Sequence, residues 1–193
     1  MTRQNEEFAS ISWLTPSKID NRRVCFVMKT VFIRAAYAGL GSAIAILALC
    51  GSSEILKHPM LMAPFGASCV ILFAIPEVPL AQPRNVVGGH FITALTGLVA
   101  VHVCPVNPVV IALTTGIGVS LMVLTKTTHP PAGANPLVIL FSHTILPWSF
   151  LLFPVVFGAL ILVSLATLYH PFTTRAYHHR FVPKPLKRRA PLS

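Results

Sequence analysis

Charged side chains are scarce in this chain. Asp, Glu, Lys and Arg make up 10% of its 193 residues, whereas hydrophobic residues make up 54%. A soluble domain typically carries about 25% charged residues. No acidic residue follows Glu77, and the bases between positions 31 and 169 are Arg34, Lys57, Arg84 and Lys126. Because so few polar groups cannot cover a water-exposed globule, we expect lipid as the surrounding solvent.

Groups suited to catalysis or metal binding are also few. The cysteines form no Cys-x-x-Cys pair, and we expect them to be small buried hydrophobic residues, not a disulfide framework or a metal site. They are Cys25, Cys50, Cys69 and Cys104. The apolar region has no paired carboxylates, and no G-x-S-x-G elbow occurs. We therefore expect no enzyme, no cofactor and no metal, and the pair His178-His179 is more typical of a solvated patch.

Basic residues gather in two flanks of the apolar region, and the chain has a formal net charge of +10. They are Lys18, Arg22, Arg23, Lys29 and Arg34 on the N-terminal side, and Arg175, Arg180, Lys184, Lys187, Arg188 and Arg189 in the tail. Basic clusters beside membrane spans set orientation by the positive-inside rule and contact anionic lipid headgroups. Because these bases lack interleaved aromatics and a soluble domain to display them, we expect no nucleic-acid binding.

We expect residues 1–28 to form a cytoplasmic or interfacial segment. They include Glu6, Glu7 and Asp20, and no small-residue cleavage site follows an early apolar core, so a cleaved signal peptide is not predicted. The stretch from Trp13 to Met28 is mildly amphipathic, which favours either an interfacial helix or a disordered tail.

The most informative feature present is a small-residue turn that interrupts two apolar stretches. The first copy is Pro64-Phe65-Gly66-Ala67-Ser68-Cys69, and the second is Pro131-Ala132-Gly133-Ala134-Asn135-Pro136. The quartet Val-Ile-Leu-Phe follows both copies, at positions 70–73 and 138–141. Short segments interrupted by Gly or Pro in matching places of two halves point to the binding site of a transporter. Chance matching in apolar sequence is the alternative, but the shared order of segments favours internal duplication.

Six apolar segments follow one another as long, short, long and again long, short, long. Their approximate bounds are 30–50, 64–75, 86–103, 108–124, 132–142 and 147–169. A helix needs about 20 residues to cross a bilayer core, so the short segments cannot cross alone. We predict an all-α membrane protein with four long transmembrane helices and two short broken helices. Its single domain covers 29–170, with repeats at about 29–103 and 107–170, and a basic tail follows at 171–193.

Three segments in each repeat is an odd number, so the second repeat is inverted if every segment crosses the membrane. Six crossings place both termini on one side, and their basic flanks make that side the cytoplasm. Small residues at four-residue spacing let helices approach closely in lipid, within one copy or in a homo-oligomer. They are Ala35, Gly39 and Ala43; Gly89, Thr93 and Gly97; and Ala112, Gly116 and Ser120.

The broken helices offer a site for a small anion. The start of a helix leaves about four N–H groups unpaired and carries roughly half a positive charge. Glycine lets the backbone approach a bound group, and a hydroxyl or an amide adds a side-chain donor. We predict that the anion is held near the membrane midplane by Gly66, Ala67, Ser68, Gly133, Ala134 and Asn135. Kinked packing helices that neighbours satisfy are the structural alternative.

His129, which directly precedes the second turn, is the candidate for coupling anion uptake to a proton. Histidine titrates near neutral pH, and an interior-negative potential opposes anion entry by about 2.3 kcal/mol per charge per 100 mV. The secondary candidates are His58, His90, Arg84 and Asn85. The histidines suit either a vestibule or a structural role, and the positive-inside bias also explains Arg84.

The residues Thr128-His129-Pro130-Pro131-Ala132-Gly133-Ala134 resemble the signature of the HPP family of integral membrane proteins. The stretch from Ala63 to Ser68, followed by that from Pro79 to Asn85, resembles the family's other hallmark. The likeness covers about residues 30–169. It implies four hydrophobic spans. Because chloroplast and cyanobacterial relatives are associated with nitrite transport, it also implies a small planar anion as the substrate.

We therefore expect a transporter of nitrite or a similar small anion in a bacterial-type inner membrane, with both termini in the cytoplasm. A passive anion channel is one alternative, and a non-transporting scaffold or accessory subunit is another. A membrane enzyme acting on a lipid or a quinone is a third. The sequence leaves the coupling ion, the direction of transport and the oligomeric state open.

Overall fold

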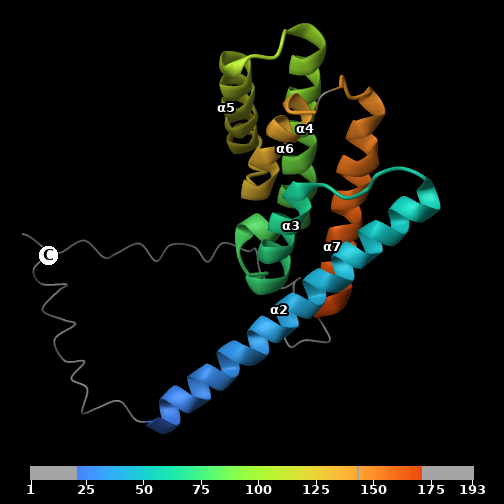
Figure 1. Ribbon diagram of the computed structural model, residues 1–193. Coiled ribbons are helices and arrows are strands. Elements are labelled where there is room, and N and C mark those ends of the chain that lie inside the picture. The colour runs from blue at the N-terminus through green and yellow to red at the C-terminus, as the bar shows by residue number, and fades with distance from the viewer. Residues whose placement is uncertain (1–20, 143, 171–193) are drawn as a thin grey trace, which may run out of the picture. The chain divides into compact units, whose positions relative to one another are not determined.

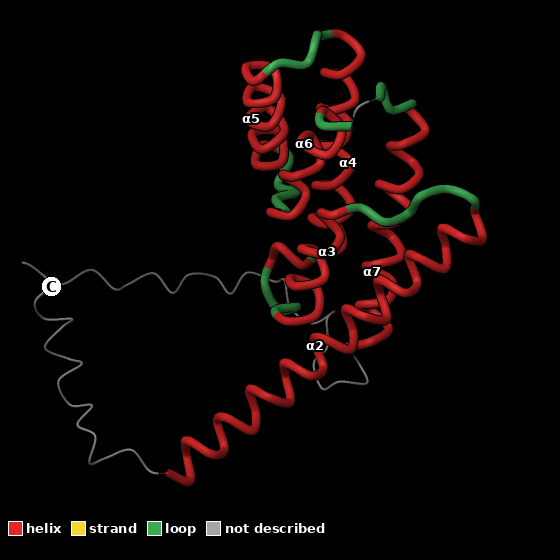
Figure 2. Tube along the Cα trace, viewed as in Figure 1, coloured by secondary structure: helices red, strands yellow, loops and turns green. Residues whose placement is uncertain are grey.

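The computed structural model describes residues 21–142 and 144–170, with side chains from Met28 onward. The described residues form helices, turns and loops, and no strand occurs among them (Figure 2). The predicted all-α class is thereby confirmed. The segment around Trp13, the pair His178-His179 and the basic tail at 171–193 lie outside the described residues.

The first helix, α2 (Asn21–Leu56), is longer than the predicted segment of 30–50. No proline occurs anywhere within it, so nothing in its sequence stops the helix before the loop that precedes Pro59. The chain divides into two compact units after Tyr37, and α2 runs through that boundary. In the first unit Val31 and Phe32 are exposed apolar side chains, as expected of a helix in lipid.

Both small-residue turns form short helices. The first is α3 (Ala63–Cys69), which continues as the π-helical η2 (Val70–Ala74). The second is the 3-10 helix η4 (Pro130–Ala134), which continues as α6 (Asn135–Leu140). Each begins with a proline in its first turn, where the missing N–H removes no helical hydrogen bond. The two short broken helices are thus present at the predicted places.

The Pro-rich stretch before the next long helix holds the short 3-10 helix η3 (Pro79–Ala81). Helix α4 (Pro83–Val103) then begins three residues earlier than predicted, because Pro83 is itself suited to the first helical position. Arg84 and Asn85 are therefore in the first turn of α4 and not in a loop. Helix α5 (Pro108–Leu124) is capped by Asn107, whose Oδ1 accepts the backbone N–H groups of Val109 and Val110 at 3.0 Å.

The last long segment is irregular at its start. It consists of the 3-10 helix η5 (Trp148–Leu151), the π-helical η6 (Leu152–Val156) and α7 (Phe157–Tyr169). Phe153 has non-helical angles of φ −123° and ψ 110°, and a cis peptide bond joins it to Pro154. Of the three parts of this last segment, only α7 is therefore a regular α-helix.

Within residues 21–142 and 144–170, three helices are long and apolar enough to cross a membrane: Met28–Leu56, Pro83–Val103 and Trp148–Tyr169. Helix α5 is apolar but has 17 residues, which corresponds to about 26 Å at 1.5 Å per residue. A bilayer core is about 30 Å thick. The fourth full-length span and the inverted repeat therefore stay predictions, whereas an all-helical membrane protein is supported.

Helix α4 is the centre of the packing, since it contacts α5, α6, η4 and α7 (Figure 1). The predicted small-residue stripe on α4 explains these contacts. A Cβ added to Gly97 would lie 3.1 Å from the Cα of Pro136, and one added to Gly89 would lie 2.9 Å from the carbonyl oxygen of Thr127. The glycines of α4 therefore let α6 and the loop before η4 approach its backbone closely.

The other two stripes do not pack in this way. Gly39 and Gly116 are exposed, and a Cβ at either position would have no neighbouring atom within 4 Å among the described residues. In the second unit, α2 buries the adjacent series Gly41, Ala45 and Leu49 instead. The stripes predicted on α2 and α5 are therefore wrong as contacts within the described chain.

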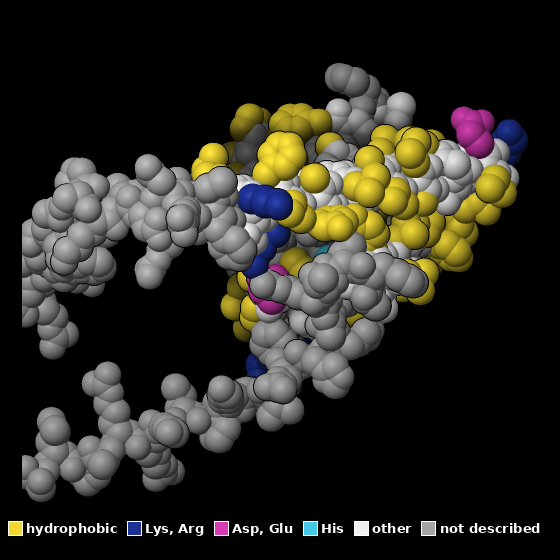
Figure 3. All heavy atoms as spheres, turned by 90° about the horizontal axis from the view of Figure 1, so that it is seen from below, with side chains coloured by type: hydrophobic (Ala, Val, Ile, Leu, Met, Phe, Trp, Pro, Cys, Tyr) yellow, Lys and Arg dark blue, Asp and Glu magenta, His cyan; other side chains and the backbone are white. Residues whose placement is uncertain are grey.

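Apolar side chains remain exposed along the helices. Leu40 and Leu47 on α2 and Leu113 on α5 are each more than half exposed. In the part of Figure 3 that is not grey, hydrophobic side chains cover much of the surface, and Lys, Arg, Asp and Glu side chains form a few small groups. Because lipid tails are as apolar as these side chains, exposing them costs little free energy in a bilayer but much more in water.

The contact of α7 with α3 gives a test of the packing. A Cβ at the buried Gly158 would collide with the Phe65 ring, so Gly158→Ala should lower the free energy of unfolding by about 1–3 kcal/mol. The control Gly116→Ala adds the same methyl group where no atom lies within 4 Å, and it should be neutral or stabilising. Thermal unfolding of both variants in detergent measures the difference. Equal stability of the two variants would contradict this packing.

Candidate functional site

Four polar side chains meet in the interior of the second unit. Ser68, His90 and His129 are 0% exposed and Asn135 is 1% exposed. We call these four residues the histidine cluster. Unbonded polar groups in an apolar interior cost several kcal/mol each, so their presence together requires hydrogen bonds among them.

The broken helices and α4 bring the cluster together. Ser68 is in the last turn of α3, and Asn135 is the first residue of α6. His129 is the extended residue immediately before η4, with φ −136° and ψ 100°. His90 is on α4, two turns from its start, next to Gly89. A Cβ at Gly89 would lie 3.0 Å from the Cβ of His129, so this glycine allows the two histidines to approach.

The Ser68 hydroxyl joins the two imidazole rings. Its Oγ lies 2.9 Å from Nε2 of His90 and 2.9 Å from Nε2 of His129. It also lies 3.1 Å from the carbonyl oxygen of Pro64, one turn earlier on α3. The ring centroids of His90 and His129 are 5.2 Å apart. Elements α3 and η4 pack against each other, and the bond from Ser68 to His129 connects them directly.

The outer nitrogens of the two imidazoles have different partners. Nδ1 of His129 lies 2.8 Å from the carbonyl oxygen of Leu80, to which it donates, because a carbonyl only accepts. Nδ1 of His90 lies 3.1 Å from the amide Nδ2 of Asn135. The same Nδ2 donates to the carbonyl oxygen of His90 and to Oγ1 of Thr93, both at 3.0 Å.

Every polar atom of the cluster has a polar neighbour within hydrogen-bonding reach, and the longest of these contacts joins Oδ1 of Asn135 to Nδ1 of His90 at 3.4 Å. Among the described residues no buried side-chain nitrogen or oxygen lacks a hydrogen-bond partner. The aromatic neighbour Phe65 covers His90 at a centroid distance of 5.1 Å. The cluster is therefore a closed network, and removing one member leaves the others buried without a partner.

The structure brings together only part of the predicted site. Ser68 and Asn135, one from each broken helix, meet at His129 and His90. Gly66 and Ala67 are on the exposed face of α3, and a Cβ at Gly66 would meet no atom within 4 Å. Gly133 and Ala134 are half-buried in η4, next in the chain to Asn135. The role of these six residues as anion ligands stays a prediction.

The secondary candidates fall into two groups. His90 belongs to the cluster, whereas His58 is exposed and its ring stacks on that of Phe153 at 5.8 Å. Arg84 and Asn85 hold the loop that leads to His129. The Arg84 guanidinium donates to the carbonyl oxygen of Thr125, and the Asn85 amide donates to that of Thr128, both at 3.0 Å. These two residues therefore position the loop.

Three partners of the cluster were not predicted as site residues. Thr93 was predicted only as one of the small residues of the α4 stripe. Its buried hydroxyl nevertheless accepts a hydrogen bond from the Asn135 amide. The other two are the backbone carbonyls of Pro64 and Leu80. A carbonyl has no residue-specific signal, so only the fold could identify these two acceptors.

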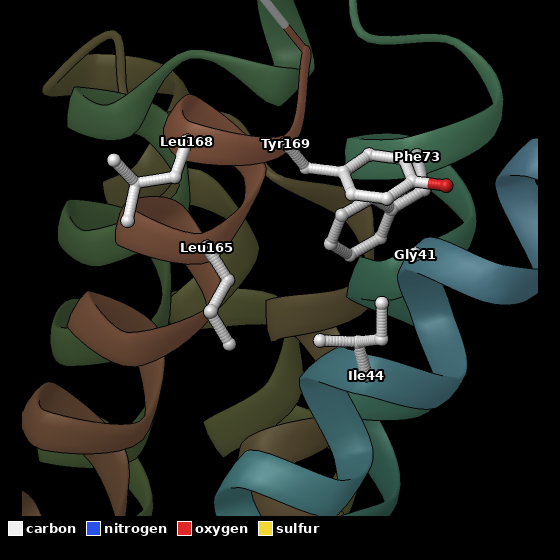
Figure 4. A pocket seen from close by; sticks show the side chains of 6 residues that line it. All are labelled: Gly41, Ile44, Phe73, Leu165, Leu168 and Tyr169. Carbon is white, nitrogen blue, oxygen red and sulfur yellow. The ribbon is translucent and has the colours of Figure 1, made fainter. Parts of the chain in front are cut away.

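An apolar pocket of about 210 Å³ lies between α2, η2 and α7 (Figure 4). It is lined by Gly41, Ile44, Phe73, Leu165, Leu168 and Tyr169. The rings of Phe73 and Tyr169 meet edge to face at one wall, at a centroid distance of 5.6 Å. None of the cluster residues lines this pocket, and its apolar wall does not suit an anion.

Electrostatics at the cluster come from neutral polar groups. The acidic residues among those described are Glu54 and Glu77, and neither belongs to the cluster. His129 lies in the loop before η4, outside the long helices. Burial lowers the pKa of its imidazole, and its hydrogen bond to the Leu80 carbonyl opposes that shift. The described residues contain no group of three or more His, Cys, Asp or Glu side chains that could hold a metal ion.

Comparison with known proteins identifies a membrane family. A family model described as the transmembrane region of HPP matches residues 28–178. Two curated Dictyostelium discoideum proteins named as transmembrane proteins are similar. One is 35% identical over 140 residues, covering 68% of this chain and 49% of its own length. The other is 33% identical over 122 residues, covering 60% and 39%. The chain thus spans about half or less of these relatives. No solved structure matches.

The closed network gives a test of its stability. Asn135→Leu keeps the volume but removes the amide that bonds to His90 and Thr93, so it should lower the free energy of unfolding by about 1–3 kcal/mol. Asn85→Ala removes a half-buried amide that water can replace, and it should cost less. Thermal unfolding in detergent measures both variants. A smaller loss in Asn135→Leu than in Asn85→Ala would contradict the assigned network.

Proposed function

The chain belongs to the HPP family of integral membrane proteins, and we propose that it carries a small anion across the membrane together with a proton. The observation that carries the proposal is the histidine cluster, which joins both broken helices to the central helix α4. Titratable groups inside a membrane protein are costly to bury and are candidates for function on that ground.

The proton has a site in the cluster. Histidine in water changes charge near neutral pH. His129 directly precedes a broken helix, and its hydrogen bond to Leu80 opposes the lowering of its pKa by burial. Anion entry against an interior-negative potential costs about 2.3 kcal/mol per charge per 100 mV. A proton bound at His129 cancels the charge of a monovalent anion, so the pair can cross as a neutral unit.

The anion has a reason to bind only after the proton. In the neutral cluster the donors of Ser68 and Asn135 are already bonded to cluster residues and backbone. Protonation of His129 adds a positive charge where the dielectric constant is low, so the attraction for an anion is strong there. The donors of Ser68 and Asn135 then become available only where the anion replaces one of their present acceptors, and Gly133 and Ala134 adjoin Asn135 in the chain. Gly66 and Ala67 would contact the anion only through their backbone N–H groups.

We propose nitrite as the anion. The support is the resemblance of residues 63–68, 79–85 and 128–134 to the hallmarks of a family with members associated with nitrite transport. A small planar anion also suits a site built from Gly, Ala, Ser and Asn residues, which leave room for it and supply polar groups. We propose that the protein carries the anion without converting it chemically and without a cofactor.

Location and assembly are further parts of the proposal. The basic flanks at both ends of the apolar region favour a cytoplasmic position for both termini. We propose a bacterial-type inner membrane, although the two similar proteins named above are from Dictyostelium discoideum. The exposed small residues around Gly39 and Gly116 would suit contact with a second copy in a homo-oligomer.

Nitrite uptake into proteoliposomes tests the function. An inward proton gradient should stimulate uptake by the wild-type protein, and His129→Gln should reduce the gradient-dependent part by roughly 10- to 100-fold. His102→Gln is the matched control, because His102 is on α4 but bonds to Leu98 and stacks on Trp148. It should retain the gradient dependence.

Other outcomes would overturn parts of the proposal. Nitrite flux that ignores the proton gradient would indicate a passive channel. No flux, with a stable partner protein retained after mild solubilisation, would indicate a scaffold or accessory subunit. Unchanged flux in Gly133→Leu and Ser68→Leu proteins that remain folded would remove these residues from the anion site.

A further inference from the structure

We propose that the Ser68 hydroxyl is a proton-dependent switch, which lets His129 hold either no extra proton or one while the heavy atoms of the cluster stay in place. This inference deepens the proposed proton coupling and rests on it for its role in transport. Its basis is the geometry of the hydrogen bonds, because each acceptor-only group around the cluster fixes the direction of one bond.

The neutral network has one consistent arrangement. Nδ1 of His129 carries a hydrogen, because it faces the Leu80 carbonyl at 2.8 Å. In a neutral imidazole the other nitrogen is then an acceptor, so Nε2 of His129 must receive the Ser68 hydroxyl hydrogen across 2.9 Å. The lone pairs of the Ser68 oxygen remain free to accept the Nε2–H of His90, also at 2.9 Å.

The orientation of Asn135 is fixed independently and agrees with this arrangement. The Asn135 atom that lies 3.0 Å from the His90 carbonyl oxygen must be the donor Nδ2, because two oxygens without a hydrogen would repel each other. The two hydrogens of that Nδ2 serve the His90 carbonyl oxygen and Oγ1 of Thr93, so Nδ1 of His90, at 3.1 Å, accepts only by sharing one of them. An imidazole that accepts at Nδ1 and is neutral carries its hydrogen on Nε2, as the bond to Ser68 requires.

Protonation of His129 changes only the position of the hydroxyl hydrogen. Nε2 of His129 becomes a donor to the Ser68 oxygen, and the oxygen now accepts from both imidazoles. The hydroxyl hydrogen turns to the carbonyl oxygen of Pro64, which lies 3.1 Å away. One proton has been gained from outside the cluster, no covalent bond between heavy atoms has changed, and each hydrogen of the three side chains still has an acceptor.

His129 rather than His90 is the group that takes the proton. The Nδ1 of His129 faces a carbonyl, and its Nε2 faces a hydroxyl oxygen, so both nitrogens of an imidazolium would have acceptors. The Nδ1 of His90 faces the N–H₂ group of Asn135, so a proton placed there would meet a donor. The Oδ1 of Asn135 is farther from it, at 3.4 Å.

The groups that face His129 from each packed element are consistent with this assignment. Element α4 presents the imidazole of His90, α3 presents the Ser68 hydroxyl and η3 presents the Leu80 carbonyl. Helices α5 and α6 also pack against η4, and neither contains a titratable or charged residue. The adjoining loop contains the exposed Lys126, and Arg84 in the first turn of α4 donates to the Thr125 carbonyl of that loop. His90 is therefore the titratable group next to His129, and its donor role at Nε2 stays the same in both states.

Nitrogen NMR of the histidine-labelled full-length protein in lipid nanodiscs tests the switch directly. At high pH the hydrogen of His129 should be on Nδ1 and that of His90 on Nε2. On acidification His129 should gain a second hydrogen while His90 remains neutral. Spectra of His129→Gln and His90→Gln proteins assign the signals. A first protonation at His90, or a hydrogen on Nε2 of both rings at high pH, would overturn the proposal.

Variants at position 68 separate the hydroxyl from general packing. Ser68→Ala removes the acceptor that the protonated ring needs, so the pH at which half of His129 is protonated should fall by about one unit. Ser68→Thr keeps a hydroxyl and should restore most of the wild-type titration. The matched control is Ser42→Ala, which removes a hydroxyl with the same bond to the carbonyl four residues earlier, outside the cluster. An unchanged His129 titration in a folded Ser68→Ala protein would overturn the switch.

The two proposals can fail separately. The NMR tautomers report the switch whether or not nitrite crosses the membrane. Correct tautomers with no proton-driven uptake in proteoliposomes would retain the switch and remove the transport function. Proton-driven uptake with the opposite tautomers would retain the function and remove the switch.

Discussion

The bond from the Ser68 hydroxyl to the two imidazoles is the interaction on which the rest of the interior depends. It joins the first broken helix to α4 and to the residue immediately before the second broken helix. A hydroxyl has one donor and two acceptor lone pairs, which is what a position between two imidazoles and a carbonyl requires. The close approach of the loop to Gly88 and Gly89 then follows, because only glycine leaves room for Thr127 and His129 beside α4.

The sequence was sufficient for the class of protein and for the places of the broken helices. The scarcity of charge predicted a lipid environment, and the two small-residue turns predicted where the short helices lie. It was less reliable for small-residue spacing. Gly97 on α4 contacts Pro136, whereas Gly39 and Gly116 contact nothing among the described residues. The spacing alone does not distinguish a helix that packs inside the chain from one whose small residues face outward.

The sequence could predict which side chains belong to the candidate site, but not the hydrogen bonds between them. Ser68, Asn135, His90 and His129 were each chosen for their chemistry and their place beside the turns, but the sequence did not indicate that they bond to one another. That depends on residues 22 to 61 positions apart, and on the carbonyls of Leu80 and Pro64. Gly66 and Ala67 show the converse, since they directly precede the buried Ser68 in the chain and are nevertheless exposed.

The connection between Ser68 and His129 also has a mechanical consequence. Elements α3 and η4 belong to different halves of the chain, and this side-chain bond links them across the interior. Any movement that parts the two halves must therefore stretch it. A hydrogen bond to an ionised group is roughly twice as strong as one between neutral groups. The hydrogen bond between the halves is consequently stronger when the His129 imidazole is ionised and weaker when it has released its proton. The energy needed to separate the halves therefore varies with the charge of a single ring.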